Sequence, residues 1–216
     1  GANIRGAGTN VIRIEGVPQL HGAIHTVIPD RIEAGTYLIA AAMAGGDVFV
    51  ENALPEHLKP VVAKLKEAGV TVEEEIDGIH VISTGKGIKA VDIKTLPYPG
   101  FPTDMQAQFM ALTTIAEGTS TVTETVFENR FMHAREMVRM GASIRIEDRI
   151  ALVSGGHPLG GTSVTSTDLR GGAALMLCGL LAEGETTLHD PNGQIARGYE
   201  DLPGMLRTLG ASVEEE

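Results

Sequence analysis

Apolar residues recur three and four positions apart in three stretches of the chain, which is typical of helices that bury one face. The stretches are HLKPVVAKLKEAG (57–69), FMHAREMVRMG (131–141) and YEDLPGMLRTLG (199–210). Each ends in a glycine, the residue that most easily adopts the left-handed conformation that stops a helix. Alternating apolar and polar residues follow in VTVEEEI and ASIRIED, and a turn then leads to IHVIST and IALVSG. The pattern predicts a helix followed by two strands.

A second and more apolar block precedes each of these helices. The blocks read DRIEAGTYLIAAAMAGGDVFVEN, TDMQAQFMALTTIAEGTSTVTET and TDLRGGAALMLCGLLAEGETTLHD. Asp30, Asp104 and Asp168 stand where helix N-caps are expected. A glycine then ends each helix before the next strand (Gly46, Gly118 and Gly184). One unit is therefore predicted to run strand, helix, strand, helix, strand, strand.

The unit recurs with a period of about 70 residues. The period is marked by four glycines: Gly1, Gly69, Gly141 and Gly210. Repeats of this kind do not bury their helix and sheet faces alone, so we expect three units to share one core. The apolar first helices are expected inside, with the sheets outside.

The two ends of the chain do not fall on unit boundaries. GANIRGAGTNVIRIEG resembles the hairpin that ends a unit, and the third unit stops before its last strand. We therefore expect the chain to be a piece of a longer protein. The expected parts are a terminal hairpin of a preceding repeat (1–20) and three units (about 21–89, 90–160 and 161–216).

Composition and charge exclude several classes of protein. The formal net charge of −11 argues against a nucleic-acid binder, and no apolar run approaches the ~20 residues of a membrane span. The single cysteine, Cys178, allows no internal disulfide and fits a reducing cytoplasm, where we expect the protein to act. Cys178 lies in an apolar helix and is more typical of a core residue than of a nucleophile. The histidines show no metal-ligand spacing, so neither a metal nor another cofactor is expected.

The stretch LPYPGFPTDMQ (96–106) is the least ordinary part of the chain. Its three prolines form a stiff, extended lead-in that holds Asp104 at a fixed point. A carboxylate fixed beside a substrate hydroxyl is what a general base requires. A capping Asp in a buried turn explains the same residues, so both interpretations stay open.

Three arginines stand where a strand or turn meets a helix. Arg130 follows a strand in ETVFENRF, Arg170 opens a helix in STDLRGG, and Arg197 precedes a helix in NGQIARGYE. Arginine forks suit carboxylate and phosphate oxygens, and helix N-termini attract anions. If the units bring together the helix N-termini at Asp30, Asp104 and Asp168, the pattern predicts an anion site that Arg31 and Arg170 reinforce. Salt-bridged loops and simple helix caps are the alternatives.

Six motifs in order resemble the second half of the bacterial UDP-N-acetylglucosamine enolpyruvyl transferases. They are RGAGT, VIPDRIEAGTY, PYPGFPTDMQ, TVFENRF, TDLR and RGYEDL. The resemblance implies an inside-out α/β barrel of three repeats, one of two such domains in the family. It also implies transfer of enolpyruvyl from phosphoenolpyruvate to the 3′-hydroxyl of UDP-N-acetylglucosamine. That reaction is the first committed step of peptidoglycan synthesis, and thus of cell-wall growth, cell shape and division.

The resemblance also implies roles for five residues. Asp104 resembles the carboxylate that contacts the sugar hydroxyl and serves as general base, and Val126 a backbone contact to the nucleotide sugar. Arg197 resembles an arginine that binds phosphoenolpyruvate, and Arg130 and Arg170 match active-site arginines. The family's first half, with a Lys-Asn pair and the acid cysteine, is not among these residues. The implied partners are therefore the two substrates and the missing N-terminal half, without which the chain is expected to be inactive.

The chain departs from the family in one motif, and two other functions stay open. The family usually has His-Ile-Asp before the arginine of RGYE, whereas this chain has Gln194, Ile195 and Ala196. One alternative is the related transfer of enolpyruvyl to 3-phosphoshikimate, and another is a non-catalytic scaffold or assembly paralogue. The motif PYPGFPTDMQ favours the nucleotide sugar as acceptor.

Overall fold

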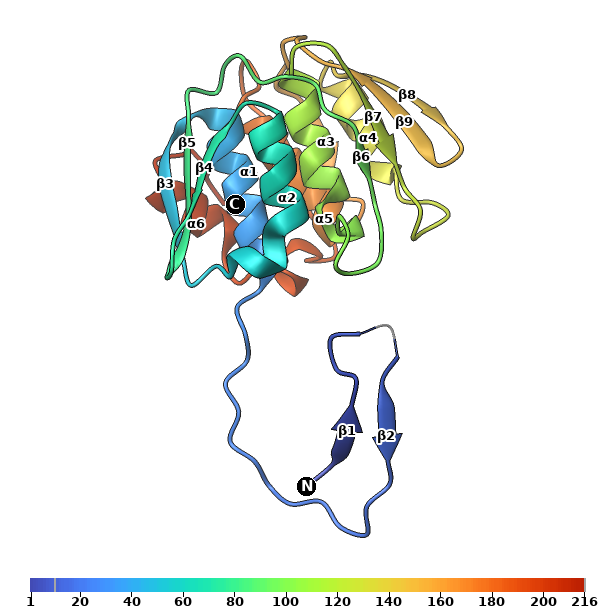
Figure 1. Cartoon of the computed structure of the whole chain (residues 1–216). Coiled ribbons are helices and arrows are strands. Elements are labelled where there is room, and N and C mark those ends of the chain that lie inside the picture. The colour runs from blue at the N-terminus through green and yellow to red at the C-terminus, as the bar shows by residue number, and fades with distance from the viewer. Residues whose placement is uncertain (10, 216) are drawn as a thin grey trace.

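The computed structural model describes residues 1–9 and 11–215, which form two visibly separate parts (Figure 1). The first part is a small hairpin that pairs β1 (Asn3–Arg5) antiparallel with β2 (Arg13–Glu15). An extended segment without assigned strands joins it to the main body, which begins at α1. The described residues up to position 30 are all exposed or only partly buried. The strand that the repeat predicts ahead of the first helix is therefore not formed.

The first unit of the body packs a layer of helices against one sheet. It contains α1 (Arg31–Ala44), β3 (Gly46–Glu51), α2 (Pro55–Glu67), β4 (Thr71–Glu74) and β5 (Gly78–Ser83). β5 lies in the middle of the sheet and pairs antiparallel with both neighbours. Val48, Val72 and Val81 share one register position, so their side chains face the helices together.

The second unit has the predicted order of elements in full. It contains β6 (Ile93–Lys94), α3 (Gln106–Ile115), β7 (Thr119–Thr123), α4 (Met132–Arg139), β8 (Ser143–Glu147) and β9 (Ile150–Ser154). Its sheet has the strand order β6-β7-β9-β8, in which only the β6–β7 pair is parallel.

The third unit is smaller. It contains β10 (Ser163–Thr165), α5 (Leu169–Gly179), β11 (Thr187–His189) and α6 (Leu202–Thr208), and β10 pairs parallel with β11. The described residues 211–215, which correspond to β4 and β8, form no strand. A strand needs a neighbour to satisfy its backbone groups, and in the other two units that neighbour is the following strand.

Three helices, α1, α3 and α5, form the centre of the body and pack against one another (Figure 1). Nearly all the residues of these three helices are buried. Because each helix is covered on all its faces, its sequence is apolar all round. The amphipathic helices α2 and α4 pack on α1 and α5 with one face. The expectation of apolar helices inside and sheets outside is confirmed.

The glycine stop signals that ended the amphipathic helices are confirmed. Gly69, Gly141 and Gly210 have φ values of +91°, +103° and +97°. Each lies two positions after the last residue of its helix. These angles lie in the left-handed region that side chains with a Cβ disfavour, so the residue type determines where the helix ends.

Candidate active site

Asp104 does not cap a helix, although the repeat predicts that it should. Asp30 accepts hydrogen bonds from the backbone N–H groups of Ile32 and Glu33, and Asp168 caps α5 in the same way. Asp104 instead lies inside a 3₁₀ turn, Thr103–Met105, that starts at Pro102 and leads into α3. This extra turn moves the carboxylate past the cap position, so the cap interpretation is wrong for Asp104.

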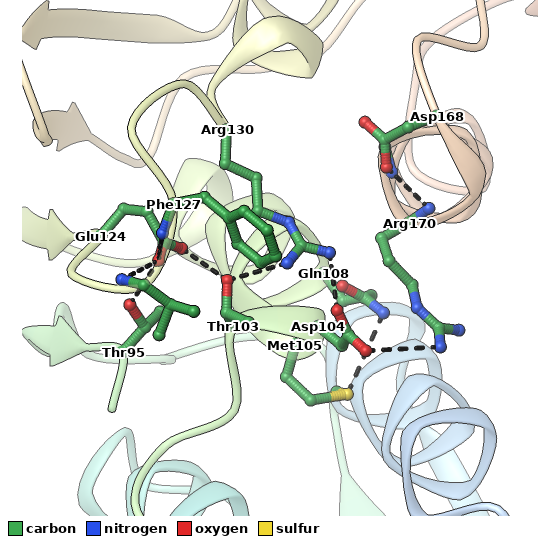
Figure 2. Close-up of polar contacts among 12 residues, drawn as sticks. Thr95, Thr103, Asp104, Met105, Gln108, Glu124, Phe127, Arg130, Asp168 and Arg170 are labelled. Atoms are coloured by element: carbon green, nitrogen blue, oxygen red, sulfur yellow. Dashed lines mark hydrogen bonds and ion pairs between the residues drawn. The ribbon is translucent and has the colours of Figure 1, made fainter. Parts of the chain in front are cut away.

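The carboxylate of Asp104 lies between two arginines from different units (Figure 2). Arg130 donates from Nη2 to Oδ1 at 2.6 Å, and Nη2 of Arg170 lies 3.7 Å from Oδ2. The Asp104 side chain is 41% exposed, whereas the side chains of Arg130 and Arg170 are 17% and 10% exposed. The carboxylate can therefore be reached from solvent, whereas the two arginine side chains are mostly buried against the protein. Of the predicted site residues, the structure brings Asp104, Arg130 and Arg170 together.

Arg170 is held by its helix and by an aromatic ring. Its backbone N–H donates to Asp168 at the start of α5, and its guanidinium lies over the ring of Tyr199 at 5.3 Å. The Nη1 atom is buried and has no hydrogen-bond partner among the described residues. A buried donor of this kind is costly unless a ligand uses it, so Arg170 is suited to an anion.

Arg130 and the loop of Val126 are connected. The guanidinium of Arg130 lies 4.7 Å from the ring centre of Phe127, and Nη1 donates to the hydroxyl of Thr103 at 2.9 Å. The backbone N–H of Val126 donates to the buried side chain of Glu124, and the Val126 side chain is exposed. Val126 is thus placed beside the arginine but not in its ion pairs.

Arg197 is not joined to Asp104, Arg130 or Arg170 by a hydrogen bond or an ion pair among the described residues. It lies in a second 3₁₀ turn, Ile195–Arg197, is exposed, and forms no ion pair among the described residues. The next residue, Gly198, lies directly against Arg170, since a Cβ there would be 3.0 Å from Nη1. Arg197 therefore borders the cluster of Asp104, Arg130 and Arg170 without forming part of it.

The sequence prediction missed a buried polar network behind the cluster. Nε2 of Gln108 donates to the hydroxyls of Thr36 and Tyr199, at 3.1 Å each, and these hydroxyls lie 3.0 Å apart. The network joins α1, α3 and the segment that carries Arg197. A glutamine amid the apolar residues of α3 was the only signal in the sequence, because its partners lie far away along the chain.

Two titratable groups near the centre of the body are shifted by burial. Burial lowers the pKa of His133 to about 4, against a smaller opposing effect of Asp168, and Arg130 lowers the pKa further. Burial also raises the pKa of the Cys178 thiol to about 12. Cys178 is therefore a poor nucleophile at neutral pH, as expected for a core residue.

Two other surface features lie outside this cluster. Among the described residues, Glu73, Glu75 and His80 are close enough to share a metal ion, but they are on the outer sheet of the first unit, largely exposed. Nε2 of His80 is already paired with Asp47, and that hydrogen bond raises the pKa of His80. A shallow apolar hollow between α2 and the β6–β7 edge contains none of the predicted site residues.

No helix in the described part of the chain is long and apolar enough to cross a membrane.

A family model described as EPSP synthase (3-phosphoshikimate 1-carboxyvinyltransferase) matches residues 1–206. The chain is 59% identical over 213 residues to UDP-N-acetylglucosamine 1-carboxyvinyltransferase 1 of Caldanaerobacter subterraneus subsp. tengcongensis, covering 99% of this chain and 51% of the relative. The UDP-N-acetylglucosamine 1-carboxyvinyltransferase of Halothermothrix orenii is also 59% identical, over 215 residues, with 100% and 51% covered. The chain thus spans about half the length of these curated relatives.

Solved structures show the same fold. The enolpyruvyl transferase NikO from Streptomyces tendae superimposes with a TM-score of 0.87 at 31% identity, covering 99% of this chain and 51% of that chain. EPSP synthase from Acinetobacter baumannii gives a TM-score of 0.70 at 20% identity over 89% of this chain and 44% of its own, which supports the fold alone. The mixed α/β fold predicted for the chain is that of the enolpyruvyl transferases.

Proposed function

The chain belongs to the EPSP synthase family of 1-carboxyvinyltransferases, and from that premise we propose that it forms one side of the active site of a UDP-N-acetylglucosamine enolpyruvyl transferase. The acceptor is proposed from the two relatives at 59% identity, whose names state it. One observation carries the proposal. The carboxylate of Asp104 caps no helix and lies between two arginines. A carboxylate placed in this way is available as a general base and does not stabilise the start of the helix.

The proposed reaction joins the 3′-oxygen of the sugar to C2 of phosphoenolpyruvate and releases phosphate. In the addition step the hydroxyl proton passes to Asp104 while C3 gains a proton from an acid, which the resemblance assigns to a cysteine outside residues 1–216. In the elimination step C3 loses a proton and the C2–O bond to phosphate breaks. Arg197 would bind phosphoenolpyruvate, Arg130 and Arg170 would add positive charge beside Asp104, and Val126 would contact the nucleotide sugar through its backbone.

We also propose how the chain is divided. Residues 1–20 form the terminal hairpin of a preceding repeat, and units of about 21–89, 90–160 and 161–216 form an inside-out α/β barrel. The packing of α1, α3 and α5 at the centre, with sheets outside them, supports this division. No bound cofactor is needed for this chemistry, and we place the protein in the cytoplasm because its single cysteine suits a reducing compartment.

A second acceptor, 3-phosphoshikimate, is supported by the description of the family model. An assay of phosphate release distinguishes the two. The first half of the Caldanaerobacter relative is fused ahead of Gly1, and phosphoenolpyruvate is supplied with either acceptor. We expect release with UDP-N-acetylglucosamine and none with 3-phosphoshikimate, nor from residues 1–216 alone. Release with 3-phosphoshikimate only would favour the second acceptor, and none with either would favour a non-catalytic scaffold.

A further inference from the structure

Glu124, at the end of β7, is a buried carboxylate that accepts four hydrogen bonds (Figure 2). It is 1% exposed. One oxygen, Oε1, accepts from the Thr95 hydroxyl at 2.8 Å and from the backbone N–H groups of Val126 and Phe127 at 2.8 and 3.1 Å. The other, Oε2, accepts from the Thr103 hydroxyl at 2.8 Å. Burying a carboxylate is expensive, and an apolar side chain would fill the same space at lower cost, so packing alone does not account for Glu124.

The contact with Thr103 gives the adjoining hydrogen bonds a fixed direction. A hydroxyl has one proton, and Thr103 donates it to Glu124. The oxygen of Thr103 is then an acceptor, which Arg130 uses through Nη1, while Nη2 of the same guanidinium donates to Asp104. The order of donors thus runs from the arginine to the threonine to the glutamate. Were the Thr103 proton turned round, it would face the protons of Arg130.

The other oxygen of Glu124 acts on the same guanidinium through the loop that carries Phe127. By accepting from Val126 and Phe127 it fixes the turn of the loop. That turn places the ring of Phe127 against Arg130. One carboxylate therefore orients both the hydroxyl and the ring that confine Arg130.

We propose that Glu124 is a positioning residue, which sets the placement of Arg130, and through it Asp104, by polarising Thr103 and fixing the Val126–Phe127 turn. Glu124 itself does not touch substrate. Its catalytic consequence rests on the proposed function, whereas its effect on Arg130 does not.

The first test is NMR of the ¹⁵N-labelled guanidinium groups in residues 1–216, with Arg130→Lys to assign the signals. Glu124→Gln keeps the shape but turns an amide donor toward Thr103. We expect rotation of the Arg130 guanidinium to become at least about tenfold faster in Glu124→Gln and in Thr103→Val. The double variant should add little to Glu124→Gln, which already disturbs Thr103 as well as the Val126–Phe127 turn. Thr103→Ser, which retains the hydroxyl, and Glu117→Gln, an exposed control, should match wild type. Should Glu124→Gln fail to fold, Thr103→Val decides. Unchanged Arg130 rotation in folded variants would overturn the proposal.

The second test is kinetic and uses the fused enzyme. Glu124→Gln should lower kcat by about tenfold to hundredfold, the scale of a small misplacement, with a smaller change in KM for the nucleotide sugar. An unchanged kcat in an active fusion would also overturn the positioning role. If the unsubstituted fusion is inactive, the proposed function fails, and the NMR result alone settles what Glu124 does to Arg130.

Discussion

Three aspartates occupy the same place in the repeat, but they do different work. Asp30 and Asp168 satisfy backbone N–H groups at the start of their helices. Asp104 has been moved off that position by one 3₁₀ turn and pairs with side chains instead. Comparison within one chain therefore identifies the residue released from a structural role.

Asp104→Asn tests this comparison in the fused enzyme. We expect kcat to fall by about 10²–10⁴-fold, the usual contribution of a general base, while nucleotide-sugar binding weakens less because the amide has the same shape. Asp30→Asn is the matched control, since asparagine caps helices nearly as well as aspartate, and its kcat should stay close to wild type. Similar rates for the two variants would leave Asp104 without a catalytic role.

His133 should make stability depend on pH. Its pKa is about 4 in the folded chain, against 6.5 for an unperturbed histidine, because burial disfavours the charged form. Between these values the unfolded chain binds the extra proton, so the free energy of unfolding falls as pH decreases from 6.5 to 4. The contribution approaches ~1.4 kcal/mol per pH unit at its steepest and ends below the folded pKa.

Urea unfolding of wild type and His133→Asn across pH 4 to 8 measures this contribution. The asparagine variant should be less sensitive to pH below about 6.5, while the two curves should run parallel above pH 7. Parallel curves over the whole range would show that His133 is not buried in its neutral form.

The residues of the cluster could be singled out in the sequence, but the residues that support them could not. Asp104, Arg130 and Arg170 stand beside prolines, turn signals and helix starts, which mark fixed points along a chain. In the sequence, nothing distinguishes Glu124 from any other acidic residue that follows a strand. Its partners Thr95 and Thr103 lie 29 and 21 residues away, and only the parallel pairing of β6 with β7 brings the first of them alongside.

At the scale of the elements, helices were predicted better than strands. Helical periodicity and glycine stops placed α2, α4 and α6 within a few residues of their observed bounds. Strands depend on partners elsewhere, so the repeat predicted a strand ahead of α1 and one after α6 that the described residues do not form. Local patterns determine a helix, whereas a strand requires a second segment.

The close approach of α5 to the turn carrying Arg197 depends on Gly172. A Cβ at Gly172 would lie 2.5 Å from the hydroxyl of Ser166 and 2.7 Å from the side chain of Ile195. Alanine normally favours a helix over glycine by about 1 kcal/mol. We nevertheless expect Gly172→Ala to lower the free energy of unfolding by about 1–3 kcal/mol through overpacking.

Gly179→Ala is the control within the same helix. Its Cβ would meet Thr186 at an ordinary 3.4 Å, so this variant should be neutral or slightly stabilising. Denaturant unfolding compares the two. Equal stability of the variants would mean that α5 shifts freely against Ile195, and that Gly172 does not set the position of Arg197.

At the scale of the whole molecule, the hairpin and the body behave as separate parts. The hairpin bonds described are internal, such as the side-chain contact of Asn3 with Glu15. Deleting residues 1–20 should therefore leave the free energy of unfolding of the body within about 0.5 kcal/mol of the intact chain. Circular dichroism during urea unfolding measures this, and a clear loss of stability would mean that the hairpin packs on the body.

The arginine pair around Asp104 also has a consequence for how fast anions arrive. The three groups carry one formal positive charge within a chain of net charge −11. An approaching anion is repelled by the molecule at long range and attracted only close to the cluster. Added salt shortens the Debye length from ~30 Å at 0.01 M to ~8 Å at 0.15 M, which removes the distant repulsion first. Encounter with this chain should therefore quicken as ionic strength rises, the reverse of an enzyme whose overall charge steers its substrate inward.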